Sequence, residues 1–184
     1  MIDDLSALAS SAEVVATVKL DGEQCTMYRD HIHARSVRGA STPSQSYVRA
    51  LHGRIAHEIP EGWRICGENL YAKHAIHYRH LDGYFYVHSI WDELTCLDFA
   101  TTLEVAMMLD LPVAPVLYRG RWDEPTLRGL YRPEHGGDPC EGYVVRTAGA
   151  FRLGEYRRLV GKYVRPGHIA AHGGGVVVRN ELRR

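Results

Sequence analysis

Cysteine is scarce in this sequence of 184 residues, and its four cysteines lie far apart along the chain, at Cys25, Cys66, Cys96 and Cys140. No two of them form a Cys-x-x-Cys pair, so the spacing excludes a zinc ribbon. Their small number also excludes the dense disulfide framework of small secreted domains. We therefore expect four reduced cysteines with structural roles.

The sequence also lacks the features of targeted or membrane-spanning chains. Its first residues, Met-Ile-Asp-Asp, are acidic where a signal peptide is basic, and no apolar run approaches the length that crosses a bilayer. The formal net charge is zero with histidine neutral, so the whole molecule has no electrostatic signature for a polyanion, although a local basic face would be enough. We expect a cytoplasmic protein that does not contact membranes.

What the sequence does contain is an ordinary globular composition, with 45% hydrophobic and 24% charged residues. This composition excludes a disordered chain and a coiled coil. The length allows one sizeable core, so we expect a single domain over residues 1–184. A run of three glycines at 173–175 suggests that residues 167–184 form a flexible tail, with no separate carboxy-terminal domain.

Hydrophobic periodicity predicts several strands and two main helices. Apolar residues recur at helical intervals over 46–59, before Pro60, and over 101–109. Residues 14–37 have the pattern of a hairpin, in which an apolar strand is followed by Asp21 and Gly22 as the turn, because glycine accepts a positive φ. Aromatic and β-branched runs predict further strands at 63–71, 84–91, 141–146 and 159–166.

The most informative segment is Lys19-Leu20-Asp21-Gly22, which follows the apolar run at 14–18. A lysine that emerges from a buried strand loses hydration, which lowers its pKa and leaves a neutral amine able to attack an electrophile. The order of strand, lysine, aspartate and glycine resembles motif I of the covalent nucleotidyltransferases, which include ligases and capping enzymes.

Further segments in the same order resemble the motifs of the type-2 RNA ligase family. The segment His33-Ala34-Arg35-Ser36 is similar to motif Ia, and Gly67-Glu68-Asn69-Leu70-Tyr71 is similar to motif III. Motifs IIIa, IV and V resemble the segments at 84–87, 141–146 and 162–165. The resemblance covers residues 14–166, so it extends over most of the chain.

This resemblance implies a role for each matching residue. Lys19 would be the nucleophile, with Arg35 and Lys162 as cations that stabilise phosphate charge. Glu68 would hold the ribose hydroxyls, and Glu141 would bind metal. Four further assignments concern the nucleobase and the nucleic acid: Phe85 would stack on adenine, with His88 as the alternative position, and Gln24 and Arg165 would contact the nucleic acid.

The fold implied by the resemblance is α+β, an ATP-grasp-like nucleotidyltransferase domain of antiparallel sheets with flanking helices around a nucleotide cleft. The implied cofactors are ATP and Mg²⁺ or Mn²⁺. The implied activity is RNA ligation: self-adenylylation of Lys19, AMP transfer to a 5′-phosphate and sealing to a 3′-hydroxyl. RNA ends, either free or in a nicked duplex, would be the substrate, and a partner protein could supply substrate affinity.

Motif V departs from the family pattern, which has two lysines separated by one residue. Here Val164 stands at the second position and Arg165 follows it. Strand alternation would place Arg165 on the face opposite Lys162, so either Lys162 acts alone or the backbone bulges. The alternatives are a DNA ligase or capping-enzyme core, and a nucleotide- or RNA-binding module without turnover.

Overall fold

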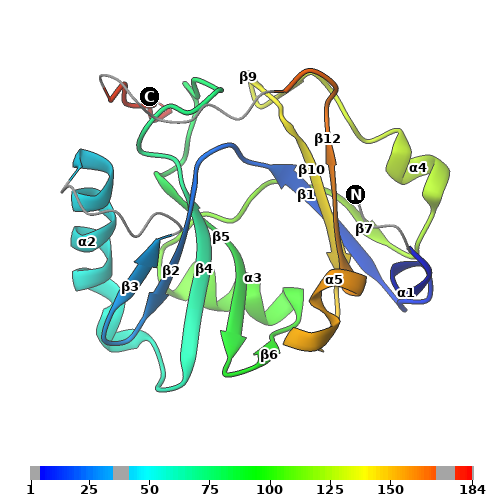
Figure 1. The fold of residues 1–184 in the computed structure, drawn as a ribbon, viewed down its shortest axis with the longest axis horizontal. Coiled ribbons are helices and arrows are strands. Elements are labelled where there is room, and N and C mark those ends of the chain that lie inside the picture. Colours follow the sequence, from blue (N-terminus) through cyan, green and yellow to red (C-terminus); the bar gives the residue numbers. More distant parts are fainter. Residues whose placement is uncertain (1–4, 35–41, 169–176, 184) are drawn as a thin grey trace.

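The structure is a computed structural model that describes residues 5–34, 42–168 and 177–183. Two antiparallel sheets face each other across the described part of the chain (Figure 1). One sheet has the order β12-β10-β1-β7, formed by Val160–Val164, Gly142–Thr147, Val14–Lys19 and Val116–Gly120. The other has the order β11-β6-β5-β4-β2-β3, formed by Phe151–Arg152, Thr95–Cys96, Phe85–Asp92, Trp63–Asn69, Glu23–Tyr28 and Ile32–Ala34. Strands β8 (Glu134–His135) and β9 (Asp138–Pro139) form a separate pair.

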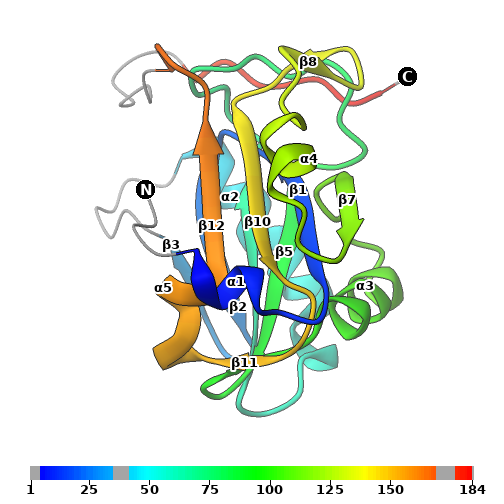
Figure 2. The same ribbon diagram turned by 90° about the vertical axis from the view of Figure 1, so that its right-hand side faces the viewer.

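Helices cover the outer faces of both sheets. Helix α2 (Pro43–Ile55) and helix α3 (Phe99–Met108) pack on the six-stranded sheet, and each begins with a side-chain cap, from Thr42 and Asp98. These caps accept hydrogen bonds from backbone N–H groups that the first helical turn leaves unpaired. The short helices α1 (Ser6–Ala9) and α4 (Glu124–Arg128) lie against the four-stranded sheet (Figure 2). The remaining helices are η1 (Ala56–Glu58), η2 (Leu153–Glu155) and α5 (Tyr156–Leu159).

Strand β1 is the central feature that positions the site. Its burial is nearly complete, because β10 pairs with one edge and β7 with the other. The chain then leaves this sheet through residues 20–22 and enters β2 in the six-stranded sheet (Figure 1). Residues 20–22 therefore link the two sheets and lie where the sheets face each other.

The α+β class and the antiparallel sheets are confirmed, but the hairpin prediction for residues 14–37 is wrong at its first turn. Strands β1 and β2 do not pair with each other, since both edges of β1 are already occupied. Only β2 and β3 form a hairpin. The expected positive φ at Gly22 is also wrong, because the described glycines with positive φ are at positions 62, 136, 137 and 167.

The prediction of a flexible tail over 167–184 is wrong for residues 177–183. Residue Asn180 is fully buried, and the backbone around it is hydrogen-bonded to the segment at 70–84. The sequence does not reveal this anchoring, because the residues that bind the segment lie about a hundred positions earlier in the chain. None of the helices in the described ranges is long and apolar enough to span a membrane.

Candidate active site

Lys19 lies at the end of β1, opposite Gly142 of β10. Its Nζ atom donates to Glu141 Oε2 at 2.7 Å, and the side chain of Glu141 is only 6% exposed. A Cβ atom at Gly142 would lie 2.0 Å from the carbonyl oxygen of Tyr163, so only glycine fits beside this pair. The two residues that the sequence analysis assigns to nucleophile and metal are thus in direct contact.

Asp21 is fixed by the segment that follows β4. Its Oδ2 atom accepts a hydrogen bond from Ile76 N at 2.8 Å, and its own backbone N–H donates to the hydroxyl of Tyr78 at 2.8 Å. Burial is the main cause that raises the pKa of Tyr78, which therefore keeps its proton. These contacts hold the loop after Lys19 in one position.

Glu68 of β4 closes the same turn from the other sheet. Its Oε1 atom accepts a hydrogen bond from Gly22 N at 3.0 Å, and a Cβ atom at Gly22 would lie 2.6 Å from the carbonyl oxygen of Asn69. Gly22 is therefore required for close approach rather than for an unusual φ. Burial raises the pKa of Glu68 to about 7. The charge of Lys19 and the hydrogen bond from Gly22 N lower this pKa and offset the effect of burial only in part.

A pocket of about 190 Å³ opens beside Lys19 and is lined by residues of both sheets. The four-stranded sheet contributes Val144 and Arg146 from β10, and the six-stranded sheet contributes Glu68 and His88. Arg146 is 6% exposed, and its Nη1 atom has no hydrogen-bond partner among the described residues. The pocket therefore combines apolar walls with an unpaired buried donor, as small-molecule sites commonly do.

His88 lies at a β-bulge of β5 and lines this pocket. Cys66 pairs with Ser89 while the next residue, Gly67, pairs with Val87, so His88 is the extra residue on β5. The imidazole is exposed on the pocket side, and its Nδ1 atom lies 3.1 Å from Ser89 Oγ. Desolvation, together with the positive charge of Arg146, lowers the pKa of His88 to about 4, so the ring is neutral at pH 7.

Phe85 does not line the pocket, and its assignment as the stacking residue does not fit the structure. The residue is 1% exposed and belongs to the core cluster between the six-stranded sheet and helices α2 and α3. The reason is strand alternation, which sends Phe85 to the face opposite the cleft. His88, the alternative position, is the residue of β5 that the structure places in the pocket.

The other predicted residues divide between the cleft and its edge. Gln24 lies opposite Glu68 on β2 and donates to Thr26 Oγ1. Lys162 lies opposite Val144 in an unbroken ladder, so these neighbours share a face of the sheet and no bulge occurs in motif V. Arg165 follows the end of β12, where its backbone N–H donates to the carbonyl of Glu141. The remaining predicted residue, Arg35, lies outside the described residues.

His168 is a residue of the site that the sequence analysis did not assign. Its side chain is 4% exposed, and its Nε2 atom lies 3.6 Å from Glu141 Oε1 and 3.9 Å from Asp21 Oδ1. Neither ring nitrogen has a hydrogen-bond partner among the described residues. A histidine after motif V, in a stretch otherwise rich in glycine and alanine, was the one available signal.

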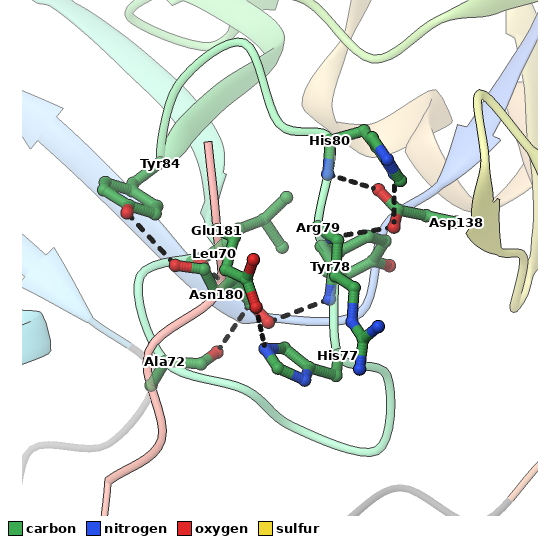
Figure 3. A network of polar contacts seen from close by, with 10 residues as sticks. All are labelled: Leu70, Ala72, His77, Tyr78, Arg79, His80, Tyr84, Asp138, Asn180 and Glu181. Atoms are coloured by element: carbon green, nitrogen blue, oxygen red, sulfur yellow. Dashed lines mark hydrogen bonds and ion pairs between the residues drawn. The ribbon is translucent and has the colours of Figure 1, made fainter. Parts of the chain in front are cut away.

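The C-terminal segment, residues 177–183, binds the loop at 70–84 (Figure 3). This is the loop whose Ile76 and Tyr78 hold Asp21. The Oδ1 atom of Asn180 accepts a hydrogen bond from Tyr78 N, and its Nδ2 atom donates to the carbonyls of Leu70 and Ala72. The hydroxyl of Tyr84 donates to the carbonyl of Asn180. The buried amide thus fixes three backbone groups around Tyr78, whose hydroxyl supports the turn after Lys19.

The same loop carries three histidines whose spacing allows a metal site in principle. In the structure, His80 lies 3.2 Å from Asp138 Oδ1 and His77 lies 3.6 Å from Glu181 Oε1, so two of them have separate carboxylate neighbours (Figure 3). Among the described residues, the group arranged for a metal ion is instead Asp21, Glu141 and His168.

Lys19 thus lies at the space between two antiparallel sheets, in contact with a buried glutamate and beside a small pocket. Residues 12–164 match the protein family described as RNA ligase, and the chain belongs to that family. No curated protein matches the chain.

Solved structures of the Naegleria gruberi RNA ligase share the fold. A point variant with ATP and Mn has a TM-score of 0.64 and 17% identity, with 90% of this chain and 54% of that chain covered. The enzyme with PPi gives a TM-score of 0.59 and 19% identity, with 86% and 51% covered. Another variant, with AMP and Mn, gives 0.56 and 18%, with 82% and 52% covered. This chain therefore spans about half the length of those RNA ligases.

Proposed function

We propose that this protein is an ATP-dependent RNA ligase whose Lys19 becomes adenylylated. The amine of Lys19 would attack the α-phosphorus of ATP, forming the N–P bond while the bond to the bridging oxygen breaks and pyrophosphate leaves. AMP would then pass to the 5′-phosphate of an RNA end, and attack by a 3′-hydroxyl would form the phosphodiester and release AMP.

The observation that carries this proposal is the contact between Lys19 and Glu141 at the mouth of the pocket. The pocket offers a neutral imidazole at His88 and an apolar wall at Val144, between which a planar adenine could stack. Stacking on an aromatic ring contributes about 1 to 3 kcal/mol per base. Glu68, on the same pocket wall, would accept hydrogen bonds from the ribose.

Phosphate charge would be balanced by Lys162 on the cleft face and by a divalent ion. Asp21 and Glu141 are the carboxylates that would hold the ion, and the unpartnered imidazole of His168 between them fits a site built for a cation. When bound, such an ion would stabilise the negative charge that develops on the phosphate oxygens. Arg35 and Gln24 remain candidates for contacts with phosphate and with the RNA.

The substrate is expected to be RNA with 5′-phosphate and 3′-hydroxyl ends, presented as single strands or as a nicked duplex in the cytoplasm. A partner protein that binds RNA would raise the affinity for such ends. A nucleotide-binding module without turnover is the second candidate, because Val164 replaces the second charged residue of motif V.

Intact mass after incubation with ATP and Mg²⁺ or Mn²⁺ tests the proposal. The wild-type protein should gain the mass of one AMP, and Lys19→Ala should gain none. If the folded wild-type protein binds ATP without forming the adduct, the binding module is the better description. If the adduct forms, ligation of labelled RNA and DNA ends then identifies the acceptor.

A further inference from the structure

We propose that Asp21, Glu141 and His168 form a metal site in which the imidazole of His168 is a direct ligand, and that this site prefers Mn²⁺ to Mg²⁺. The use of the ion in catalysis rests on the proposed function, whereas its binding does not. The proposal begins from the way each carboxylate divides its two oxygen atoms.

Each carboxylate uses one oxygen for the protein and directs the other toward His168. Oδ2 of Asp21 accepts from Ile76 N, and Oδ1 lies 3.9 Å from His168 Nε2. Oε2 of Glu141 accepts from Lys19, and Oε1 lies 3.6 Å from the same nitrogen. Two oxygens from distant parts of the chain thus converge on one buried nitrogen.

These distances are too long for hydrogen bonds, so the three groups do not satisfy one another directly. A buried polar atom without a partner is costly, and native proteins rarely retain one without a function. The three ligand atoms lie within 4.8 Å of one another. Two donors on one ion, each at about 2.1 Å, lie at most about 4.2 Å apart, so small side-chain rotations bring all three onto one ion.

The donor set determines which ion is preferred. Mg²⁺ is bound by oxygen ligands and retains several waters, whereas imidazole is a good ligand for transition metals. A site with two carboxylates and one imidazole should therefore bind Mn²⁺ more tightly than Mg²⁺. Without His168, the remaining carboxylates should lose most of that preference.

Electron paramagnetic resonance of Mn²⁺ added to the full chain without ATP tests the proposal directly. Bound Mn²⁺ in the wild-type protein should show spin-echo modulation from a coupled ¹⁴N nucleus, and His168→Ala should abolish that modulation. The same variant should weaken Mn²⁺ binding about tenfold or more and change Mg²⁺ binding, measured by competition, much less. His57→Ala, which removes an exposed histidine paired with Glu58, is the matched control and should leave both unchanged.

His168→Asp supplies a second variant, in which oxygen replaces nitrogen. It should retain a divalent site and shift the ratio of Mn²⁺ to Mg²⁺ affinities toward Mg²⁺ by about tenfold. Absence of nitrogen coupling in the wild-type protein would overturn the proposal, even if both variants fail to fold. If Lys19 is adenylylated but no nitrogen coupling is seen, the proposed function stands and the metal-site proposal is wrong. If the coupling is seen but no adduct forms, the metal-site proposal stands and the proposed function is wrong.

Discussion

Two buried side chains after β12, Asn180 and His168, differ in how far the protein satisfies them. Both hydrogen-bonding atoms of the Asn180 amide have partners, on Tyr78, Leu70 and Ala72. Both nitrogens of His168 have none among the described residues. The amide therefore stabilises the fold, whereas the nitrogens of the imidazole remain available to bind the proposed metal ion.

Other residues of the cleft also carry polar groups that the protein does not fully satisfy. Four buried side-chain nitrogens in the described part of the chain lack a partner, and three of them belong to Arg146 and His168. The carboxyl of Glu68 adds a half-buried acid whose pKa is raised to about 7. Sites that bind charged ligands often carry such costs, which the rest of the structure must offset.

Removal of the Asn180 amide should have the largest effect on stability. Asn180→Ala leaves a backbone N–H and two carbonyls without partners, and each such group costs about 1 to 3 kcal/mol. We expect the free energy of unfolding to fall by about 3 kcal/mol or more, as measured by urea denaturation. Leu182→Ala, which truncates a side chain 43% exposed on the same segment, is the control and should change little. Equal stabilities of the two variants would contradict the anchoring role.

Replacement of Glu68 should act in the opposite direction, and only at high pH. The pKa of its carboxyl is about 7 in the folded protein against an ordinary value of 4.5, so the unfolded chain ionises first as the pH rises. The wild-type protein thus loses stability between about pH 4.5 and 7, and the penalty is complete above that window. Since each pKa unit corresponds to about 1.4 kcal/mol, Glu68→Gln should be more stable than wild type by at most about 3 kcal/mol at about pH 8.

At about pH 4 both forms of the side chain are uncharged, so the two proteins should unfold at the same denaturant concentration. Comparison of the two unfolding curves at both pH values is the required measurement. The glutamine can still accept the hydrogen bond from Gly22 N, which keeps the turn intact. A variant less stable than wild type at high pH would show that the charge is satisfied in the folded state.

The contrast between Asn180 and His168 also shows what the sequence could predict. Strands such as β4, β5 and β10 were predictable because their hydrophobic pattern is local. Lys19, Glu68 and Glu141 could be assigned to one site because their motifs occur in order, and the structure brings the three side chains together. Asn180 was not, since its partners are separated from it by about a hundred residues and no pattern near it marks a buried amide.

The position of Phe85 has a different physical origin. Alternation places Phe85 and His88, which are three positions apart, on opposite faces of β5, but it does not say which face is the cleft. Helices α2 and α3 cover the face that carries Phe85, which leaves His88 on the side of the pocket. Because these helices come from other parts of the chain, a single strand read by itself contains no signal for that choice.

Removal of the His168 imidazole should have the smallest effect on the stability of the metal-free protein. His168→Ala loses some packing of a side chain that is 4% exposed, and it also removes the cost of two buried nitrogens without partners. These opposing terms should leave the free energy of unfolding within about 1 kcal/mol of wild type, in contrast to Asn180→Ala.

Saturating Mn²⁺ should then separate the stabilities of the wild-type protein and His168→Ala. At a concentration about 100 times Kd, a ligand stabilises the folded state by about 2.7 kcal/mol, and the variant should gain far less at the same Mn²⁺ concentration. Thermal unfolding of both proteins with and without Mn²⁺ measures this difference, and an equal gain would mean that the imidazole takes no part in the site.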